Sequence, residues 1–159
     1  MTNHNETSFP VADVPGFLFI DHLAIAVPQG SLEGQVAAYK VLGFREMHRE
    51  DVLGTDQVRE VLLQIGNGPN LIQLLEPLSP ESPVQKQIEK SGGRGGFAHV
   101  GFRVKSAKAA FDQMQKDGFR IIDKAPRPGS RGTTVFFVHP KSREQNPFGF
   151  LIEVVEDPA

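Results

Sequence analysis

The chain has 159 residues, a length that suits one domain or two small fused modules, and at 39% hydrophobic it can bury a core. Its 17 basic and 19 acidic residues give a net charge of −2, so we expect neither a nucleic-acid partner nor a membrane partner. Cysteine is absent, which excludes disulfides and thiolate metal sites, and no stretch approaches the roughly 20 apolar residues of a membrane span.

The chain begins with a polar stretch, residues 1–17, that has neither a basic region nor an apolar run. This pattern argues against a secretory signal, and it predicts a flexible tail. Together with the missing cysteines, it leads us to expect a cytoplasmic protein. We expect the remainder, 18–157, to form a single domain.

The first part of that domain, 18–80, has the pattern of a β-α-β-β-β module. An apolar strand at 19–27 precedes a helix that Ser31 can cap and that ends at Gly43. Three extended segments follow, at 44–50, 57–66 and 70–78.

The second part, 96–157, repeats this order. A strand at 97–104 precedes a helix from Ser106 to Gly118, and extended segments follow at 119–123, 133–140 and 150–156. The connector, 81–95, has a helix signal of its own that begins at Ser82. The sequence therefore predicts an α+β fold built from two tandem βαβββ modules.

Polar residues occupy matching core positions in the two modules. His22 and His99 open the first strand of each module, and Gln73 and Glu153 lie within the last apolar strand of each. Each histidine alone is more often a hydrogen-bonded core residue, and a lone buried carboxylate needs a partner or a metal. If the modules pack about a pseudo-twofold axis, the four side chains converge. We therefore predict a site for a divalent ion, with two coordination positions left for substrate.

The other histidines and one carboxylate receive simpler interpretations. His139 is expected in a loop or at a pocket rim, His48 on the surface and His4 in the tail. Because side chains alternate along a strand, Asp21 should lie on the face opposite His22, so we expect it to drop out of the site and to act as a local hydrogen-bonding residue. The small residue Ala24 is expected to leave space for a substrate.

Several stretches together resemble the vicinal oxygen chelate (glyoxalase/bleomycin resistance/dioxygenase) superfamily, and within it the methylmalonyl-CoA epimerases. They are IDHLAIAV, LLEPLSPESPV, HVGFRV, PRPGSRG, VFFVHPKS and LIEVVE, and the likeness spans about residues 18–157. It implies a cup-shaped mixed sheet around a metal site, an acyl-CoA substrate and a homodimer. The implied reaction is epimerisation of methylmalonyl-CoA, or of a close 2-alkylmalonyl thioester, through a metal-stabilised enolate.

The resemblance also implies roles for individual residues. The metal ligands would be His22, Gln73, His99 and Glu153, with Co²⁺ favoured and Ni²⁺, Mn²⁺, Zn²⁺ and Fe²⁺ also suited to these donors. Glu60 and Glu153 would be the acid/base pair on either side of the substrate α-carbon. The phosphates of coenzyme A need basic groups, for which Lys141 and Arg127 are candidates.

Other activities of the same scaffold stay open at this point. They are a glyoxalase-type isomerase of the lactoylglutathione lyase kind, an extradiol dioxygenase and a metal-free binding module. A fourth ligand, Gln73, argues mildly against the dioxygenase, and the intact ligand set argues against the binding module. Two departures from the family pattern, the small and polar segment 28–40 and a longer loop at 143–149, bear on the acyl pocket.

Overall fold

The computed structural model describes residues 15–142 and 148–157. The expected tail falls almost wholly outside this range, as does most of the longer loop. In chain order the elements are β1 (Phe17–Ala26), α1 (Leu32–Val41), β2 (Arg45–Val52), β3 (Val58–Gln64), β4 (Leu71–Pro77), α2 (Pro83–Lys90), β5 (Gly96–Val104), α3 (Ala107–Lys116), β6 (Arg127–Pro128), a 3₁₀ turn (Ser130–Gly132), β7 (Thr134–Val138) and β8 (Leu151–Glu156).

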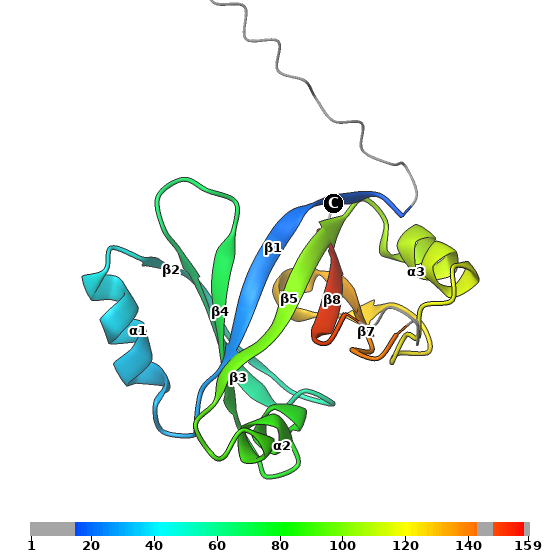
Figure 1. Cartoon of the computed structure of the whole chain (residues 1–159). Coiled ribbons are helices and arrows are strands. Elements are labelled where there is room, and N and C mark those ends of the chain that lie inside the picture. The colour runs from blue at the N-terminus through cyan, green and yellow to red at the C-terminus, as the bar shows by residue number, and fades with distance from the viewer. Residues whose placement is uncertain (1–14, 143–147, 158–159) are drawn as a thin grey trace, which may run out of the picture.

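The strands form one mixed sheet whose two halves, one from each module, have the same arrangement. Their order is β2-β3-β4-β1-β5-β8-β7-β6, with β1 antiparallel to β5 at the centre. In each module the first strand lies parallel to the last, β1 beside β4 and β5 beside β8. Figure 1 shows the sheet curling, with α1 and α3 at its two sides and α2 below the central strands. The predicted α+β fold with a duplicated βαβββ pattern is therefore confirmed.

Carboxylates of the last strands hold the starts of the two outer helices. Ser31 makes no side-chain cap on α1, contrary to the prediction. Instead Glu76 Oε2 accepts the backbone N–H groups of Gly30 and Leu32, at 2.9 and 3.0 Å. In the second module Glu156 Oε1 accepts the N–H of Ala107 at 3.0 Å, and here a serine cap is present as well. Both contacts satisfy amides that a helix cannot pair by itself.

The segment 119–123 was predicted as a strand, and this prediction is wrong. It makes only an isolated bridge, between Ile121 and Val138. The cause is Asp123, whose side chain accepts the N–H of Phe137 at 2.7 Å and so replaces a backbone carbonyl as its partner. The strand that takes this place in the module is the two-residue β6.

Three buried apolar clusters hold the elements together and frame the site. One packs α1 against β3 and β4, and its counterpart packs α3 against β7 and β8. The third lies on the opposite side of the central strands and includes Ala24, Leu75 and Ile88 of α2. The two outer helices thus cover one side of the sheet, and the inner side is left to α2 and a cavity. None of the helices in the described ranges is long and apolar enough to cross a membrane.

Candidate metal centre and acid/base site

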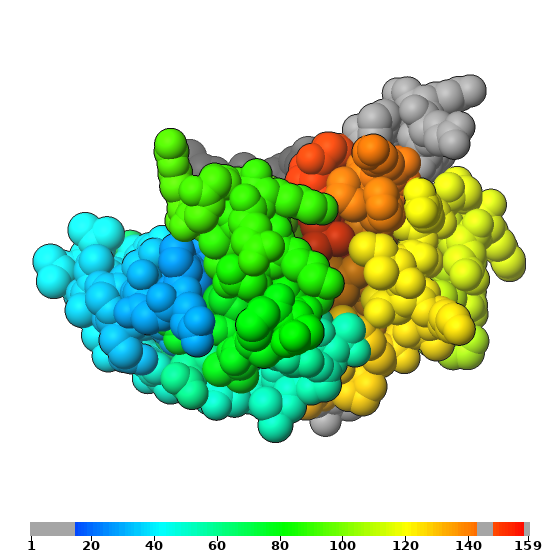
Figure 2. Space-filling model, turned by 90° about the horizontal axis from the view of Figure 1, so that it is seen from below, coloured from blue at the N-terminus to red at the C-terminus, as the bar shows by residue number. Residues whose placement is uncertain are grey.

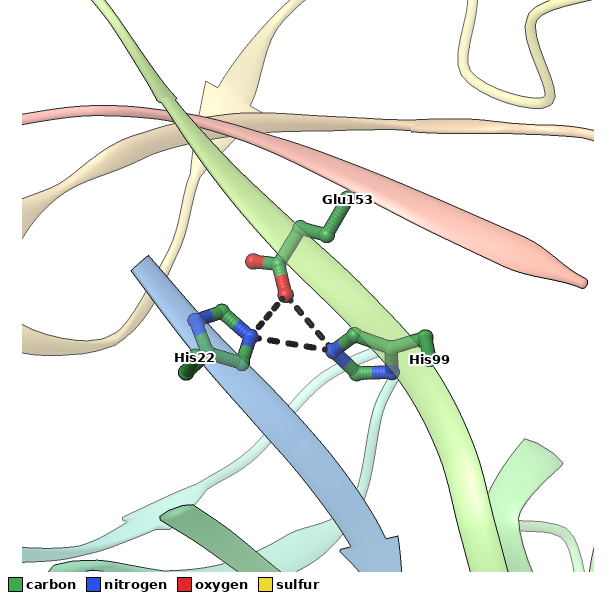
Figure 3. A group of neighbouring side chains, drawn as sticks. All are labelled: His22, His99 and Glu153. Atoms are coloured by element: carbon green, nitrogen blue, oxygen red, sulfur yellow. Dashed lines mark hydrogen bonds and ion pairs between the residues drawn. The ribbon is translucent and has the colours of Figure 1, made fainter. Parts of the chain in front are cut away.

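Three of the four predicted ligands meet in a triangle on the inner side of the sheet. His22 of β1 and His99 of β5 place their Nε2 atoms 3.2 Å apart. Glu153 Oε2, from β8, lies 3.1 Å from the first and 2.9 Å from the second of these nitrogens. Figure 3 shows the three side chains pointing toward one another from three neighbouring strands. All three are buried.

This triangle has the dimensions of a metal site. Donor atoms about 2.1 Å from one ion and at right angles lie about 3.0 Å apart, close to the observed separations. Two imidazoles and a carboxylate are also a common donor set for divalent transition metals. The described residues hold one such group of histidine and carboxylate side chains, His22, His99 and Glu153. The donor set and its spacing therefore fit a divalent ion.

Gln73 and Glu60 lie beside the triangle and are hydrogen-bonded to each other. Gln73 Nε2 donates a hydrogen bond to Glu60 Oε2 at 2.7 Å. The amide oxygen of Gln73, Oε1, and the other carboxylate oxygen of Glu60, Oε1, are both buried without a hydrogen-bond partner. Such orphaned acceptors are expensive unless a ligand or ion satisfies them. Gln73 Oε1 suits a fourth metal ligand, and Glu60 Oε1 suits a proton acceptor.

Burial raises the pKa of Glu60 above its ordinary value, and the negative charge of Glu153 adds to this effect. The side chain of Ser130 works in the opposite direction. Burial alone would also raise the pKa of Glu153, but hydrogen bonds from His22 and His99 outweigh it and hold that pKa well below its usual range. The two carboxylates therefore have different proton affinities, as an acid/base pair requires.

Small residues make room for the two histidine rings across the β1–β5 pair. Gly101 stands opposite His22, and a Cβ at this position would lie only 2.1 Å from His22 Cε1. Ala24 stands opposite His99 in the same way. Because Ala24 is fully buried in a core cluster and is not part of the cavity wall, it accommodates His99 rather than a substrate.

Asp21 belongs to the site, and the prediction that it drops out is wrong. A register shift between Ile20 and His22 places two residues of β1 opposite one of β5. This β-bulge interrupts the alternation of side chains. Asp21 Oδ2 accepts a hydrogen bond from His22 Nδ1 at 2.7 Å. Burial opposes the charged form of His22, but the hydrogen bonds and charges of Asp21 and Glu153 outweigh it and raise its pKa to about 9.

A cavity of about 510 Å³ opens beside these groups, between α2 and the second module. Its wall includes Glu60, Gln73, His99 and Glu153, and its remaining lining is largely apolar. Figure 2 views the molecule from below, with α2 in green beside the yellow and orange second module. Lys86 and Lys90 of α2 also line the cavity. Sequence reasoning missed these lysines, although their spacing of four on a predicted helix was a usable signal.

The two cations chosen from the sequence are placed differently. Arg127 lines the cavity, but its guanidinium group is paired with Asp123 at 2.9 Å and with Asp56 at 3.3 Å. Lys141 is exposed and is not among the lining residues, whereas its neighbour Pro140 is. His139 is half-buried next to Pro140, and its Nδ1 accepts the N–H of Lys141 at 3.0 Å. His48 lies on β2, outside the cavity wall.

Known proteins place this arrangement in a family. A family model described as the glyoxalase/bleomycin resistance protein/dioxygenase superfamily matches residues 21–137. The human mitochondrial methylmalonyl-CoA epimerase is 30% identical over 141 residues, a match that spans 86% of this chain and 77% of the human protein. The chain belongs to the methylmalonyl-CoA epimerase branch of this superfamily.

Two further epimerases, one compared by sequence and one by structure, are similar to this chain. The ethylmalonyl-CoA/methylmalonyl-CoA epimerase of Cereibacter sphaeroides is 32% identical over 123 residues, covering 77% of this chain and 88% of that protein. The structure of Streptomyces coelicolor methylmalonyl-CoA epimerase in complex with 2-nitronate-propionyl-CoA superposes with a TM-score of 0.79 at 32% identity, covering 91% of this chain and all of that one. The recognition made from the sequence motifs is thereby confirmed.

Proposed function

We propose that this epimerase interconverts the two C2 epimers of methylmalonyl-CoA, or of a close 2-alkylmalonyl thioester, through a metal-stabilised enolate. The observation that carries the proposal is the placement of two carboxylates with different proton affinities, Glu60 and Glu153, on the wall of one cavity beside a histidine-carboxylate triangle. Membership of the epimerase branch supports the same chemistry and leaves the glyoxalase, dioxygenase and metal-free binding functions without support of their own.

The metal would be held by His22, His99 and Glu153, with Gln73 Oε1 as the fourth ligand. A bound divalent ion supplies Lewis acidity that stabilises negative charge on the oxygens of an enolate. The family resemblance makes Co²⁺ our preferred ion, and the mixed set of imidazole nitrogens and oxygen donors suits Ni²⁺, Mn²⁺, Zn²⁺ and Fe²⁺ as well. Gln73 has a second task, since its amide N–H holds Glu60 by a hydrogen bond.

Glu60 would remove the α-proton on one face of the substrate, and Glu153 would serve the other face. The raised pKa of Glu60 makes this carboxylate a stronger base than an exposed one. Its free Oε1 atom is the one available to receive the proton.

The coenzyme A part of the bound substrate would extend from the cavity along α2. Lys86 and Lys90 are exposed at its wall and suit the phosphates of this cofactor. Arg127, whose charge two aspartates already balance, and the exposed Lys141 remain candidates for weaker contacts with the same groups.

Assembly is proposed from the exposed apolar residues of one strand. We propose a homodimer, because Leu18, Phe19, Ile20 and Leu23 of β1 are each roughly two-fifths exposed (41, 39, 43 and 39%). The cytoplasmic location stays a prediction from the sequence.

The direct test of the proposed activity is conversion of (2R)- to (2S)-methylmalonyl-CoA by metal-stripped protein and by protein reloaded with Co²⁺. We expect conversion only after reloading. The same assay with ethylmalonyl-CoA measures how large an α-substituent the cavity accepts. Turnover of the glutathione–methylglyoxal hemithioacetal, with no epimerisation, would instead establish a glyoxalase.

A further inference from the structure

Asp21 is a buried carboxylate whose two oxygens have separate partners. Oδ1 accepts a hydrogen bond from Arg103 at 2.5 Å. Oδ2 accepts one from His22 Nδ1 at 2.7 Å and another from Arg131 at 2.9 Å. A single oxygen atom therefore connects the guanidinium group of Arg131 to the imidazole of a proposed metal ligand.

Arg131 reaches this oxygen from a distant part of the chain. It lies in the 3₁₀ turn Ser130–Gly132, 110 residues away from Asp21. The turn is tightly closed, because Gly129 N–H donates to Thr133 O at 2.9 Å and Thr133 Oγ1 donates to Ser130 O at 2.6 Å. Ser130 and Gly129 line the cavity next to Glu60. The turn thus borders the proposed base, Glu60. Through Arg131 it also contacts Asp21, the partner of the proposed metal ligand His22.

Two features of Arg131 are unfavourable by themselves. Its backbone is left-handed, with φ 57° and ψ 21°, a conformation that costs little for glycine and more for any residue with a Cβ. Its Nε atom is also buried without a hydrogen-bond partner. The contact that offsets both is the ion pair with Asp21, whose carboxylate is almost completely buried. A glycine would fit this backbone better, so the reason for an arginine here lies in its side chain.

A carboxylate that accepts a hydrogen bond from the far N–H of a ligating histidine fixes the orientation of the ring and the nitrogen that faces the metal. The carboxylate can do this only if other side chains fix its own position. Building on the proposed function, we propose that Arg131 is a positioning residue: it anchors Asp21 Oδ2 so that the His22 ring keeps Nε2 directed toward His99 and Glu153. Arg103 anchors the other oxygen from β5.

The test measures Co²⁺ affinity, by competition with a chromophoric chelator, in the wild type, Arg131→Met, Arg131→Gly and Arg131→Lys. We expect Arg131→Met and Arg131→Gly to bind Co²⁺ about 10-fold or more weakly, the usual effect of removing such an outer partner. Arg131→Lys keeps a positive charge near Asp21 and should recover part of the affinity. The thermal midpoint of metal-free Arg131→Gly should stay above that of metal-free Arg131→Met, because both lose the ion pair with Asp21 and only glycine relieves the left-handed backbone.

The matched control is Arg59→Met, which removes an exposed arginine paired with Asp51 and leaves the cavity wall unchanged. It should bind Co²⁺ as the wild type does. The proposal is overturned if Arg131→Met and Arg131→Gly both stay within about twofold of the wild type, or if the control loses as much affinity. Because substrate is absent, a wild type that binds Co²⁺ but does not epimerise contradicts the proposed function and not the role of Arg131. A wild type that binds no Co²⁺ overturns the metal site and this inference with it.

Discussion

At the scale of single residues, the site depends on how closely two backbones approach. Gly101 is required because the His22 ring occupies the space that a Cβ would fill, 2.1 Å from Cε1. Gly101→Ala should therefore displace the ring and lower Co²⁺ affinity by at least about 10-fold, as other disturbances of ligand orientation do. Chelator competition measures this change. Gly96→Ala on the same strand, where a Cβ would meet nothing within 4 Å, is the control for substitution in β5, although its positive φ adds some strain.

Glu60→Gln separates proton transfer from metal binding. The amide oxygen of glutamine can still accept the hydrogen bond from Gln73 Nε2, so the neighbouring ligand should keep its place. An amide cannot remove the α-proton, and we expect the epimerisation rate to fall by about 10²- to 10⁴-fold. Metal content per chain, measured by mass spectrometry, should match the wild type. Loss of metal together with activity would show that Glu60 is a structural support of the ligands.

The repeat explains why the main site residues could be predicted from sequence. His22 and His99 occupy equivalent strand positions, and duplication brings them to adjacent central strands. Asp21 was misassigned because a β-bulge in β1 breaks the two-residue alternation of side chains. The sequence of this strand gives no sign of a bulge. Arg131 was missed because its partner is 110 residues away.

At the scale of elements, a buried carboxylate determines where α1 begins. Glu76→Ala removes the acceptor of two backbone N–H groups, from Gly30 and Leu32. Leaving these donors unpaired should lower the free energy of unfolding by about 1–3 kcal/mol in urea denaturation. Glu89→Ala, an exposed substitution on α2, should change it by roughly 0.5 kcal/mol or less. Equal effects of the two substitutions would contradict a specific role for Glu76 in α1.

Most elements followed from apolar periodicity and from serine and glycine boundary signals. The serine signals at the starts of α2 and α3 were informative, because Ser82 and Ser106 do cap these helices. Failures occurred where a side chain took over a backbone contact. Asp123 replaced a strand carbonyl in 119–123, and Glu76 replaced Ser31 as the partner of α1. Such contacts join residues far apart in sequence, so local patterns do not reveal them.

At the scale of the whole molecule, the exposed apolar residues of β1 predict self-association. Leu18→Glu places a charge in this group and should convert a dimer to a monomer in sedimentation velocity. Leu53→Glu, at an exposed position outside β1, should leave the dimer intact. A wild-type protein that sediments as a monomer at micromolar concentration would contradict the proposed assembly.

The two modules contribute different parts of one reaction site. Glu60 and Gln73 come from the first module and His99 and Glu153 from the second, so the cavity exists only where both halves of the sheet meet. The α+β architecture was predictable because each module repeats the same order of elements. The contribution of α2 was missed, although the spacing of Lys86 and Lys90 on a predicted helix was a usable signal that one face of this helix is basic.

The central claim is that this cavity removes the α-proton of a malonyl thioester with the help of a divalent ion. It is tested most directly by incubating methylmalonyl-CoA in D₂O with protein of measured metal content and following deuterium at C2 by mass spectrometry. Co²⁺-loaded protein should incorporate deuterium far faster than metal-stripped protein. Incorporation by the loaded protein that does not exceed the metal-stripped control would contradict the claim.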